Sequence, residues 1–278
     1  MANREQLVER EKQVSPLSNR EIGEADQRSS PSAKVIHEAI RLEGSEELGR
    51  LATSVIWSGL AAGLTMGASM LGQGLLMARL PDAPWRELIA SFGYAAGFVF
   101  VTLGRQQLFT ETTLTVMLPV LHGTHRAREV VRYWALVFAA NIVGTLLFAA
   151  AATIPQLFQP EAAQAFARLG IKAAEPGFLA VLLKGVMAGW LIALMVWLMP
   201  AAASARILVI VAVTWLIAAA ELSHVIAGSV EAGFAAMTGA IGWGDYLAGF
   251  LLPALIGNSL GGIVFVALLN HAQVREEI

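Results

Sequence analysis

Long apolar runs fill the chain from residue 50 to residue 270, and short polar stretches separate them. A helix needs about 20 mostly apolar residues to cross a bilayer. The pattern therefore predicts six membrane-spanning regions, over residues 50–78, 88–121, 132–154, 177–199, 207–237 and 246–270. We expect a polar loop with a short helix over 155–176. The predicted fold class is an all-α integral membrane protein.

Polar residues interrupt two of these regions. The fifth opens with ILVIVAVTWLIAAA, whose 14 residues are too few to cross a bilayer, and continues through Glu221 and His224 into VIAGSVEAGFAAM. The second is interrupted at residues 105–107. Ionisable groups at membrane depth are costly and normally face a cavity or a partner. Each interruption is therefore predicted to be a break in a membrane helix.

The N-terminal region differs from the rest. Residues 1–48 hold seven Lys/Arg and ten Asp/Glu, and residues 1–30 are predicted to be a polar tail. Residues 33–48 place five apolar side chains on roughly one helical face: Val35, Ile36, Ala39, Ile40 and Leu42. This short amphipathic helix is predicted either to lie on the membrane or the protein, or to lead into the first span. We divide the chain into a tail at 1–48, a six-span domain at 49–272 and a tail at 273–278.

Composition narrows the class of protein. The chain is 56% hydrophobic and 14% charged, against about 25% charged residues in soluble domains. A net charge of −2 gives no polybasic signal for nucleic acid, and the absence of cysteine excludes disulfides, thiolate chemistry and Cys-ligated metal. We expect no metal or cofactor. The N-terminus lacks the pattern of a cleaved signal peptide.

Orientation follows from Lys and Arg in short loops, which concentrate on the cytoplasmic side. Five such residues lie on one side of the predicted topology and four on the other. The first group is Arg126, Arg128, Arg132, Arg206 and Arg275, and the second is Arg79, Arg86, Arg168 and Lys172. The long charged N-terminal arm also disfavours translocation. Both termini are therefore predicted to be cytoplasmic.

The two halves of the chain resemble each other. The first and fourth spans contain Gly59-Leu-Ala-Ala-Gly63 and Gly185-Val-Met-Ala-Gly189, and the third and sixth contain Asn141-Ile-Val-Gly144 and Asn258-Ser-Leu-Gly261. Each half has three spans with the middle one interrupted, so the second half must insert upside down. This arrangement is the inverted repeat of many transporters. The alternative is a coincidence of composition, because small residues are common in membrane helices.

These repeated residues have predicted physical roles. Gly59 and Gly63 share a helix face and permit close approach of a neighbouring helix. Asn141 and Asn258 are predicted to hydrogen-bond backbone that is freed at the helix breaks. An ordinary interhelical hydrogen bond is the alternative for both amides.

Four motifs together resemble the formate/nitrite transporter family over residues 50–272. They are Leu108-Phe109-Thr110 at the first break, His224-Val-Ile-Ala at the second, Gly257-Asn258-Ser-Leu-Gly261-Gly262, and Leu194-Met-Val-Trp197. The resemblance implies an aquaporin-like fold with broken helices 2 and 5, assembled as a homo-pentamer in the bacterial inner membrane with one pore per protomer. It also implies passage of small monovalent anions such as formate, nitrite or hydrosulfide, or of their neutral acids.

The resemblance further implies two apolar constrictions flanking a central His224. Leu108, Phe109 and Ile192 match the cytoplasmic constriction, and Tyr94, Phe98 and Ile217 fall at the periplasmic one. Lys172 is similar to a loop lysine that attracts anions at the vestibule. The chain departs from formate channels at Gly189, where they often carry Asn, and at Ser223, where they often carry Glu.

Four charges also depart from the family pattern: Arg105, Glu111, Lys184 and Glu221. Because single buried charges are costly, we predict two pairs, Arg105 with Glu111 and Lys184 with Glu221. The alternatives are that Lys184 or Glu111 reaches an interface or a vestibule, or that Lys184 faces the pore and attracts anions.

A histidine at a helix break suits proton transfer to a weak acid. Burial favours the neutral imidazole, and an arriving anion favours the imidazolium, which could then protonate it. The uncharged acid would cross the apolar constrictions, whereas a bare anion would face a large desolvation cost. The alternative is a structural histidine that holds the loop.

Three functions compete. The first is a channel or carrier for small anions, or otherwise for neutral solutes. The second is a membrane enzyme, which is disfavoured because Ser69 lacks the glycine of a nucleophile elbow and no HExxH motif is present. The third is a non-conducting structural or sensing protein on the same fold.

Overall fold

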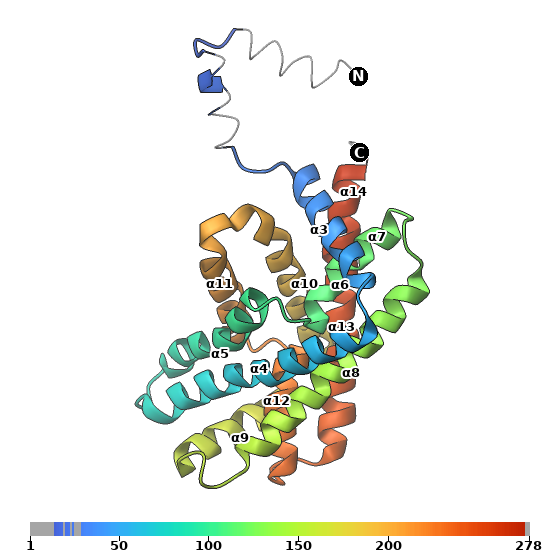
Figure 1. The fold of residues 1–278 in the computed structure, drawn as a ribbon. Coiled ribbons are helices and arrows are strands. Elements are labelled where there is room, and N and C mark those ends of the chain that lie inside the picture. Colours follow the sequence, from blue (N-terminus) through green and yellow to red (C-terminus); the bar gives the residue numbers. More distant parts are fainter. Residues whose placement is uncertain (1–13, 19, 23, 25–28, 276–278) are drawn as a thin grey trace. The chain divides into compact units, whose positions relative to one another are not determined.

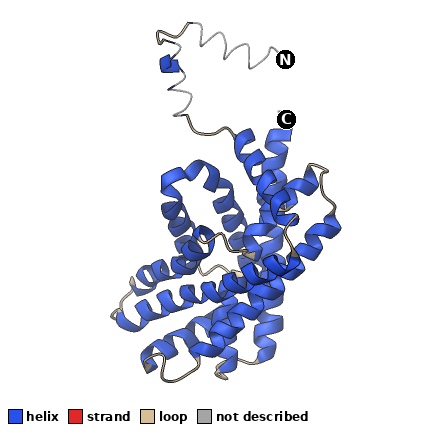
Figure 2. Cartoon of the chain, in the orientation of Figure 1, coloured by secondary structure: helices blue, strands red, loops and turns tan. Residues whose placement is uncertain are grey.

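The structure is a computed structural model that describes residues 14–18, 20–22, 24 and 29–275. The chain divides into two compact units, Met1–Ser32 and Ala33–Ile278. Within the described residues the regular elements are helices (Figure 2). Most of the predicted polar tail lies outside the described residues, and the second unit holds all of the apolar regions.

Four helices among the described residues are long and apolar enough to cross a membrane. They are α4 (Ala52–Arg79), α5 (Arg86–Leu103), α8 (Ala127–Ala152) and the continuous stretch Phe178–Ala219. That stretch has 42 residues, which as a straight helix would span about 63 Å, twice the roughly 30 Å core of a bilayer. Its chain reverses instead (Figure 1).

The reversal occurs at a short 3-10 turn. It separates α10 (Phe178–Ala202) from α11 (Arg206–Ala219), and Ala203 within it has a positive φ of 40°. Pro200 lies just before the turn and removes a backbone donor there. The fourth predicted region thus corresponds to α10, the first part of the fifth corresponds to α11, and these two helices are antiparallel.

Non-helical backbone replaces helix at both predicted interruptions. After α5 ends, the chain resumes as α6 (Phe109–Thr115) and α7 (Met117–Leu121), and after α11 it resumes as α12 (Val225–Met237). Short loops join these pieces within the helical body (Figure 1). Helices α6 and α12 each begin inside the protein, so the backbone at both starts needs internal hydrogen-bond partners.

The two breaks have matched backbone geometry. Arg105 and Glu221 adopt left-handed φ values of 52° and 54°. At each break, the amide of the left-handed residue donates to the carbonyl three residues before it. The amide of the next residue, Gln106 or Leu222, donates to the carbonyl five residues before it. A left-handed residue is a common way to end a helix, although glycine usually takes that position. Both breaks therefore use the same helix-ending turn.

The remaining elements complete the helical body. The predicted short helix in the 155–176 loop is α9 (Pro160–Ala174). The sixth predicted region is irregular: π-helical turns η2 (Asp245–Leu251) and η3 (Ile263–Leu268) flank α13 (Leu252–Gly262), and α14 (Leu269–Arg275) follows.

Helix α3 (Ala33–Leu48) packs against the protein rather than merely leading into the first span. It contacts α7, α10 and α14. Its buried face consists of residues spaced about one helical turn apart, together with one neighbour: Ile36, His37, Ile40 and Gly44. The buried face differs from the predicted one, because Val35 and Leu42 are 57% and 54% exposed.

Two helix pairs pack at unusually short separation, α4 with α8 and α10 with α13. A Cβ at Gly63 would collide with the carbonyl oxygen of Asn141, and one at Gly189 would collide with that of Asn258. At Gly59 a Cβ would lie 2.9 Å from the Cβ of Ala140. Only glycine allows these approaches, which bring each asparagine to the neighbouring helix.

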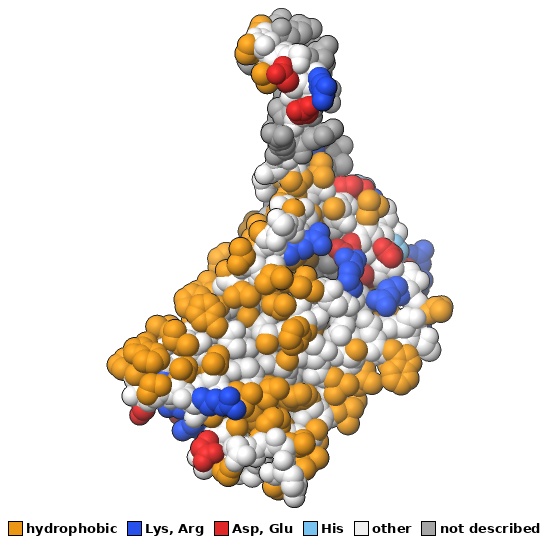
Figure 3. All heavy atoms as spheres, turned by 60° about the vertical axis from the view of Figure 1, so that its left-hand side comes forward, with side chains coloured by type: hydrophobic (Ala, Val, Ile, Leu, Met, Phe, Trp, Pro, Cys, Tyr) orange, Lys and Arg blue, Asp and Glu red, His pale blue; other side chains and the backbone are white. Residues whose placement is uncertain are grey.

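Apolar side chains cover much of the outer surface. In Figure 3 they form a broad area, and charged side chains gather toward its two ends. Large exposed side chains include Trp57, Phe92, Phe100 and Leu183. A continuous apolar exterior of this size marks a surface for lipid or for other subunits.

Candidate functional site

The starts of the two inner helices meet at a buried contact between Thr110 and His224. Thr110 Oγ1 lies 2.8 Å from His224 Nε2, and both side chains are almost fully buried. His224 is also the N-cap of α12, where its Nδ1 accepts a hydrogen bond from the Ala227 amide at 3.2 Å. An accepting Nδ1 carries no proton, so the neutral ring is protonated at Nε2 and donates to Thr110.

Asn141 fixes the start of α6. Its Oδ1 accepts from the amide of Phe109 at 2.9 Å, and its Nδ2 donates to the carbonyls of Gly59 and Gln107 at 2.8 and 2.9 Å. One side-chain amide therefore satisfies an unpaired helix-start N–H, a loop carbonyl and a carbonyl of α4.

Asn258 does the same for α12. Its Oδ1 accepts from the amide of Val225, and its Nδ2 donates to the carbonyls of Gly185 and Ser223, each at 2.8 Å. The two sets of three bonds match position by position along the two halves of the chain. The matched bonds hold the breaks, and with them Thr110 and His224, in fixed positions.

Apolar side chains surround this contact. The six residues placed at constrictions by resemblance are all at most 5% exposed and belong to one core cluster: Tyr94, Phe98, Leu108, Phe109, Ile192 and Ile217. The edge-to-face contact of Phe98 with the His224 ring has a centroid distance of 4.9 Å, and Tyr94 packs on Phe98 at 5.3 Å. The structure thus brings His224 together with Phe98 and Thr110.

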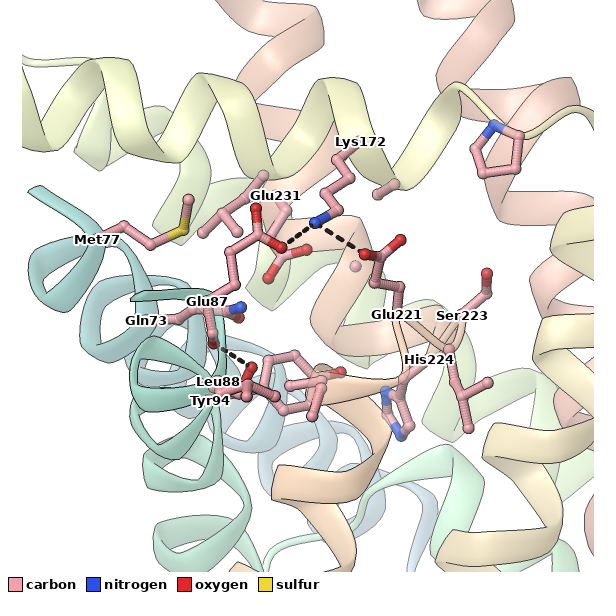
Figure 4. Close-up of a pocket in the computed structure, with 18 of the residues that line it drawn as sticks. Gln73, Met77, Glu87, Leu88, Tyr94, Lys172, Glu221, Ser223, His224 and Glu231 are labelled. Atoms are coloured by element: carbon pink, nitrogen blue, oxygen red, sulfur yellow. Dashed lines mark hydrogen bonds and ion pairs between the residues drawn. The ribbon is translucent and has the colours of Figure 1, made fainter. Parts of the chain in front are cut away.

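A cavity of about 290 Å³ opens on one side of His224 (Figure 4). We call it the His224 cavity. Its wall comes from α4, α5, α9, the end of α11, the second break, α12 and η2 (Asp245–Leu251). Polar and ionisable groups in the wall include Gln73, Glu87, Ser91, Tyr94, Lys172, Glu221, Ser223, His224 and Glu231.

Lys172 lies in this wall, where the resemblance places a vestibule lysine. Its Nζ is 2.6 Å from Glu87 and 3.0 Å from Glu221 (Figure 4). These carboxylates raise the pKa of Lys172 and keep it charged, although burial acts in the opposite direction as the largest single effect. Its charge is therefore already balanced by two carboxylates.

The four unusual charges pair only partly as predicted. Lys184 lies 3.8 Å from Glu221, which it shares with Lys172. The predicted pair of Arg105 with Glu111 is wrong: Arg105 binds Glu43 of α3 at 2.8 Å, and Glu111 accepts from Thr102 at 2.7 Å. Arg105 and Glu221 are also 73% and 48% exposed, so neither is buried as predicted.

A second cavity, of about 600 Å³, lies between α3, the first break and the end of α10. We call it the α3 cavity. Seven charged residues line it: Glu43, Glu46, Glu47, Arg50, Arg105, Glu111 and Arg206. Glu47 accepts a hydrogen bond from Thr115 at 2.5 Å, and burial raises its pKa to about 7. Within the described residues, no cluster of three or more His, Asp or Glu side chains could hold a metal ion.

Sequence reasoning missed two features of these cavities. The first is that α3 lines the α3 cavity. This placement depends on contacts between residues far apart in the sequence, such as Glu43 and Arg105, which are 62 positions apart. Glu231, which lines the His224 cavity, was read only as part of an apolar run. Its spacing of seven residues from His224, two helical turns on one face, was the signal that could have identified it.

Comparison with known proteins gives a consistent family assignment. The formate/nitrite transporter family model matches residues 34–272. The inner membrane protein YfdC of Escherichia coli (strain K12) is 40% identical over 258 residues, which cover 92% of this chain and 83% of that protein.

Two solved structures share the fold. One is described as a pentameric formate channel with formate bound: it has a TM-score of 0.69 at 20% identity and covers 81% of this chain and 98% of its own. The other is described as a formate/nitrite transporter (FNT) family ion channel: it has a TM-score of 0.71 at 20% identity and covers 87% and 96%. With the family match over most of its length, the chain belongs to the formate/nitrite transporter family.

Proposed function

We propose that this chain is a membrane channel or transporter for small monovalent anions, or for the neutral weak acids that they form. The observation that carries the proposal is the buried meeting of two inner helix starts at Thr110 and His224, 2.8 Å apart, beside a cavity and among apolar side chains. This arrangement places a titratable group inside an apolar path, which is the requirement for moving a weak acid across a membrane.

The proposal includes a topology of six spans in two inverted halves, with both termini in the cytoplasm. The matched sets of hydrogen bonds from Asn141 and Asn258, and the matched left-handed turns at Arg105 and Glu221, support the repeat. In this topology residues 49–272 form the channel domain. The bacterial inner membrane and a homo-pentamer complete the proposal, supported by the similarity to the inner membrane protein YfdC and to the pentameric formate channel.

In this proposal His224 exchanges a proton with the permeant between two apolar constrictions. The neutral ring already uses Nε2 to donate to Thr110 and Nδ1 to accept from Ala227. Donating a proton from the neutral ring would leave an imidazolate, so the ring must first gain a proton at Nδ1. That proton comes from solvent water and displaces the hydrogen bond from the Ala227 amide. The imidazolium then passes its Nε2 proton to the anion, which leaves a neutral ring protonated at Nδ1. The resulting neutral acid avoids the desolvation cost of a bare anion.

The balanced charge of Lys172 bears on the form in which the permeant crosses. A lysine already bonded to Glu87 and Glu221 offers little free positive charge to an approaching anion. We therefore propose that the neutral acid is the species on the cavity side of His224, and that the anion meets Nε2 on the other side, where Thr110 lies.

Flux measurements in proteoliposomes test this proposal. Purified protein is reconstituted, and uptake of formate, nitrite and hydrosulfide is followed by stopped flow in the wild type, in His224→Asn and in the control His125→Asn. We expect wild-type flux for at least one of the three anions, a fall of about tenfold or more in His224→Asn, and wild-type flux in the control.

Folding must be verified for each protein by size-exclusion chromatography before flux is compared. A folded wild-type oligomer that carries none of the three anions would favour a non-conducting role and refute the proposal. Equal flux in the wild type and His224→Asn would leave transport intact but refute proton exchange at this ring.

A further inference from the structure

Glu231 is an ionisable residue that the proposed function leaves without a role. It lies on α12, in the wall of the His224 cavity, and is only 7% exposed. Its Oε1 is buried and has no hydrogen-bond partner in the described structure. A buried polar atom without a partner is rare in native proteins and calls for an explanation.

The position of Glu231 along α12 relates it to His224. Seven residues separate them, which is two helical turns, so both side chains lie on about the same face of the helix and about 10 Å apart along its axis. Both line the same cavity, as do Tyr94 of α5 and Lys172 of α9. A small molecule that leaves His224 along this cavity therefore passes the Glu231 carboxyl.

The surroundings of Glu231 offer it no cation. Lys172 is the sole Lys or Arg among the described residues of the cavity wall, and it is bonded to Glu87 and Glu221. Besides Glu87 and Glu221, the other titratable groups in the cavity wall are Tyr94 and His224. A buried carboxylate without a paired cation is costly, so these surroundings favour an uncharged carboxyl.

An uncharged carboxyl presents a donor and an acceptor side by side. A planar oxyacid in its neutral form, such as formic or nitrous acid, also has a hydroxyl donor and an oxygen acceptor, on two oxygens that are bonded to the same carbon or nitrogen. The two can join by a pair of hydrogen bonds, whereas hydrogen sulfide has no oxygen acceptor and cannot complete the pair. The cavity volume of about 290 Å³ exceeds the roughly 30 Å³ that one water occupies in the liquid, so it holds such a molecule with several waters.

We propose that Glu231 is a specificity-determining residue that selects small neutral oxyacids over hydrogen sulfide by paired hydrogen bonds in the His224 cavity. The inference rests on the proposed transport function and names the substrate class of the same path. No proton changes owner at Glu231 in this step; the carboxyl only binds.

The test compares formate and hydrosulfide flux in proteoliposomes for three variants. Glu231→Gln keeps a donor and an acceptor, Glu231→Leu removes both at similar size, and Glu161→Leu is the control on the exposed face of α9. In Glu231→Leu we expect formate flux to fall about tenfold and hydrosulfide flux to stay within about twofold of the wild type. In Glu231→Gln and the control, both fluxes should stay within about threefold.

Formate flux in Glu231→Leu within about twofold of the wild type would overturn the inference, and so would an equal fall for formate and hydrosulfide.

Infrared difference spectroscopy gives a readout that does not depend on flux or on the folding of the leucine variant. The wild type should show the carbonyl band of a protonated carboxyl that is absent in Glu231→Gln and that shifts when formate is added. Absence of that band, or a band that formate does not shift, overturns the inference even if transport is intact. A wild type that shows the shift but no flux refutes the transport proposal alone.

Discussion

At the scale of single residues, the Asn258 side chain makes three hydrogen bonds to backbone groups of α10, the second break and α12. Replacing it by leucine leaves the Val225 amide and the carbonyls of Gly185 and Ser223 without their partner inside an apolar interior. An unpaired buried group costs roughly 1–3 kcal/mol, so we expect Asn258→Leu to destabilise the protein by about 3 kcal/mol or more. The thermal unfolding midpoint in detergent measures this loss.

Ser259→Ala is the matched control, one position along α13. It removes only a hydrogen bond from the serine side chain to the Leu255 carbonyl of the same helix. We expect a change of less than about 1 kcal/mol there. Equal midpoints for the two variants would contradict the role assigned to Asn258.

Arg105 shows where reasoning from single residues reached its limit. Pairing with Glu111 was predicted because the two residues are close in sequence and their charges are opposite. The partner is instead Glu43, 62 positions away on α3. No local sequence pattern reports the left-handed φ of 52° at Arg105. The amide roles of Asn141 and Asn258, by contrast, were predictable because each polar amide lies inside an otherwise apolar span, at matching places in the two halves of the chain.

At the scale of helices, the α4 and α8 pair depends on a glycine. A Cβ at Gly63 would collide with the backbone of Asn141, which cannot move without losing its bonds to the first break. Overpacking a core costs about 1–3 kcal/mol, so we expect Gly63→Ala to lower the free energy of unfolding by a similar amount. The thermal unfolding midpoint should fall accordingly. Gly249→Ala is the control, because nothing lies within 4 Å of a Cβ there. A Gly63→Ala midpoint as high as that of the control would contradict the close packing.

Helix α3 docks on α14 through a pair of histidines. His37 Nε2 and His271 Nδ1 lie 3.1 Å apart, which requires at least one neutral ring. Burial lowers the pKa of His37 and of His271, and the positive charge that His271 gains on protonation lowers the pKa of His37 further. Free histidine titrates near pH 6.5, so the undocked state takes up protons first as the pH falls. We expect docking to be strongest above about pH 6.5 and to weaken below it.

Hydrogen exchange of α3 peptides at about pH 7.5 and 5.5, corrected for intrinsic rates, measures this docking. Glu47 acts in the opposite direction, because its pKa is raised to about 7 and its protonated form favours the docked helix as the pH falls. The comparison is therefore made in a Glu47→Gln background, with and without His271→Asn. Protection of α3 that falls equally with pH in both proteins would contradict the role of the histidine pair.

At the scale of the whole molecule, hydrophobic patterning predicted most elements and the family motifs predicted the fold. The pattern located both breaks because ionisable residues interrupt apolar runs that are too short alone. It did not predict the π-helical turns on either side of α13. Nor did it predict the α3 cavity, whose wall joins residues from Ala39 to Arg206.

The proposed topology makes a prediction that the composition of the chain allows to be tested cleanly. The sequence has no cysteine, so an introduced one is the sole thiol. Six spans with cytoplasmic termini place Arg128 and Ser204 on the cytoplasmic side and Gln156 and Trp243 on the other, and all four side chains are exposed. In intact spheroplasts, a membrane-impermeant maleimide should label Gln156→Cys and Trp243→Cys but not Arg128→Cys or Ser204→Cys. All four should react after lysis, which shows that each thiol is accessible. Labelling of Ser204→Cys together with Gln156→Cys and Trp243→Cys in intact spheroplasts would put all three on one side of the membrane. The chain between them would then not cross as six spans require, and the inverted arrangement of the two halves would fail.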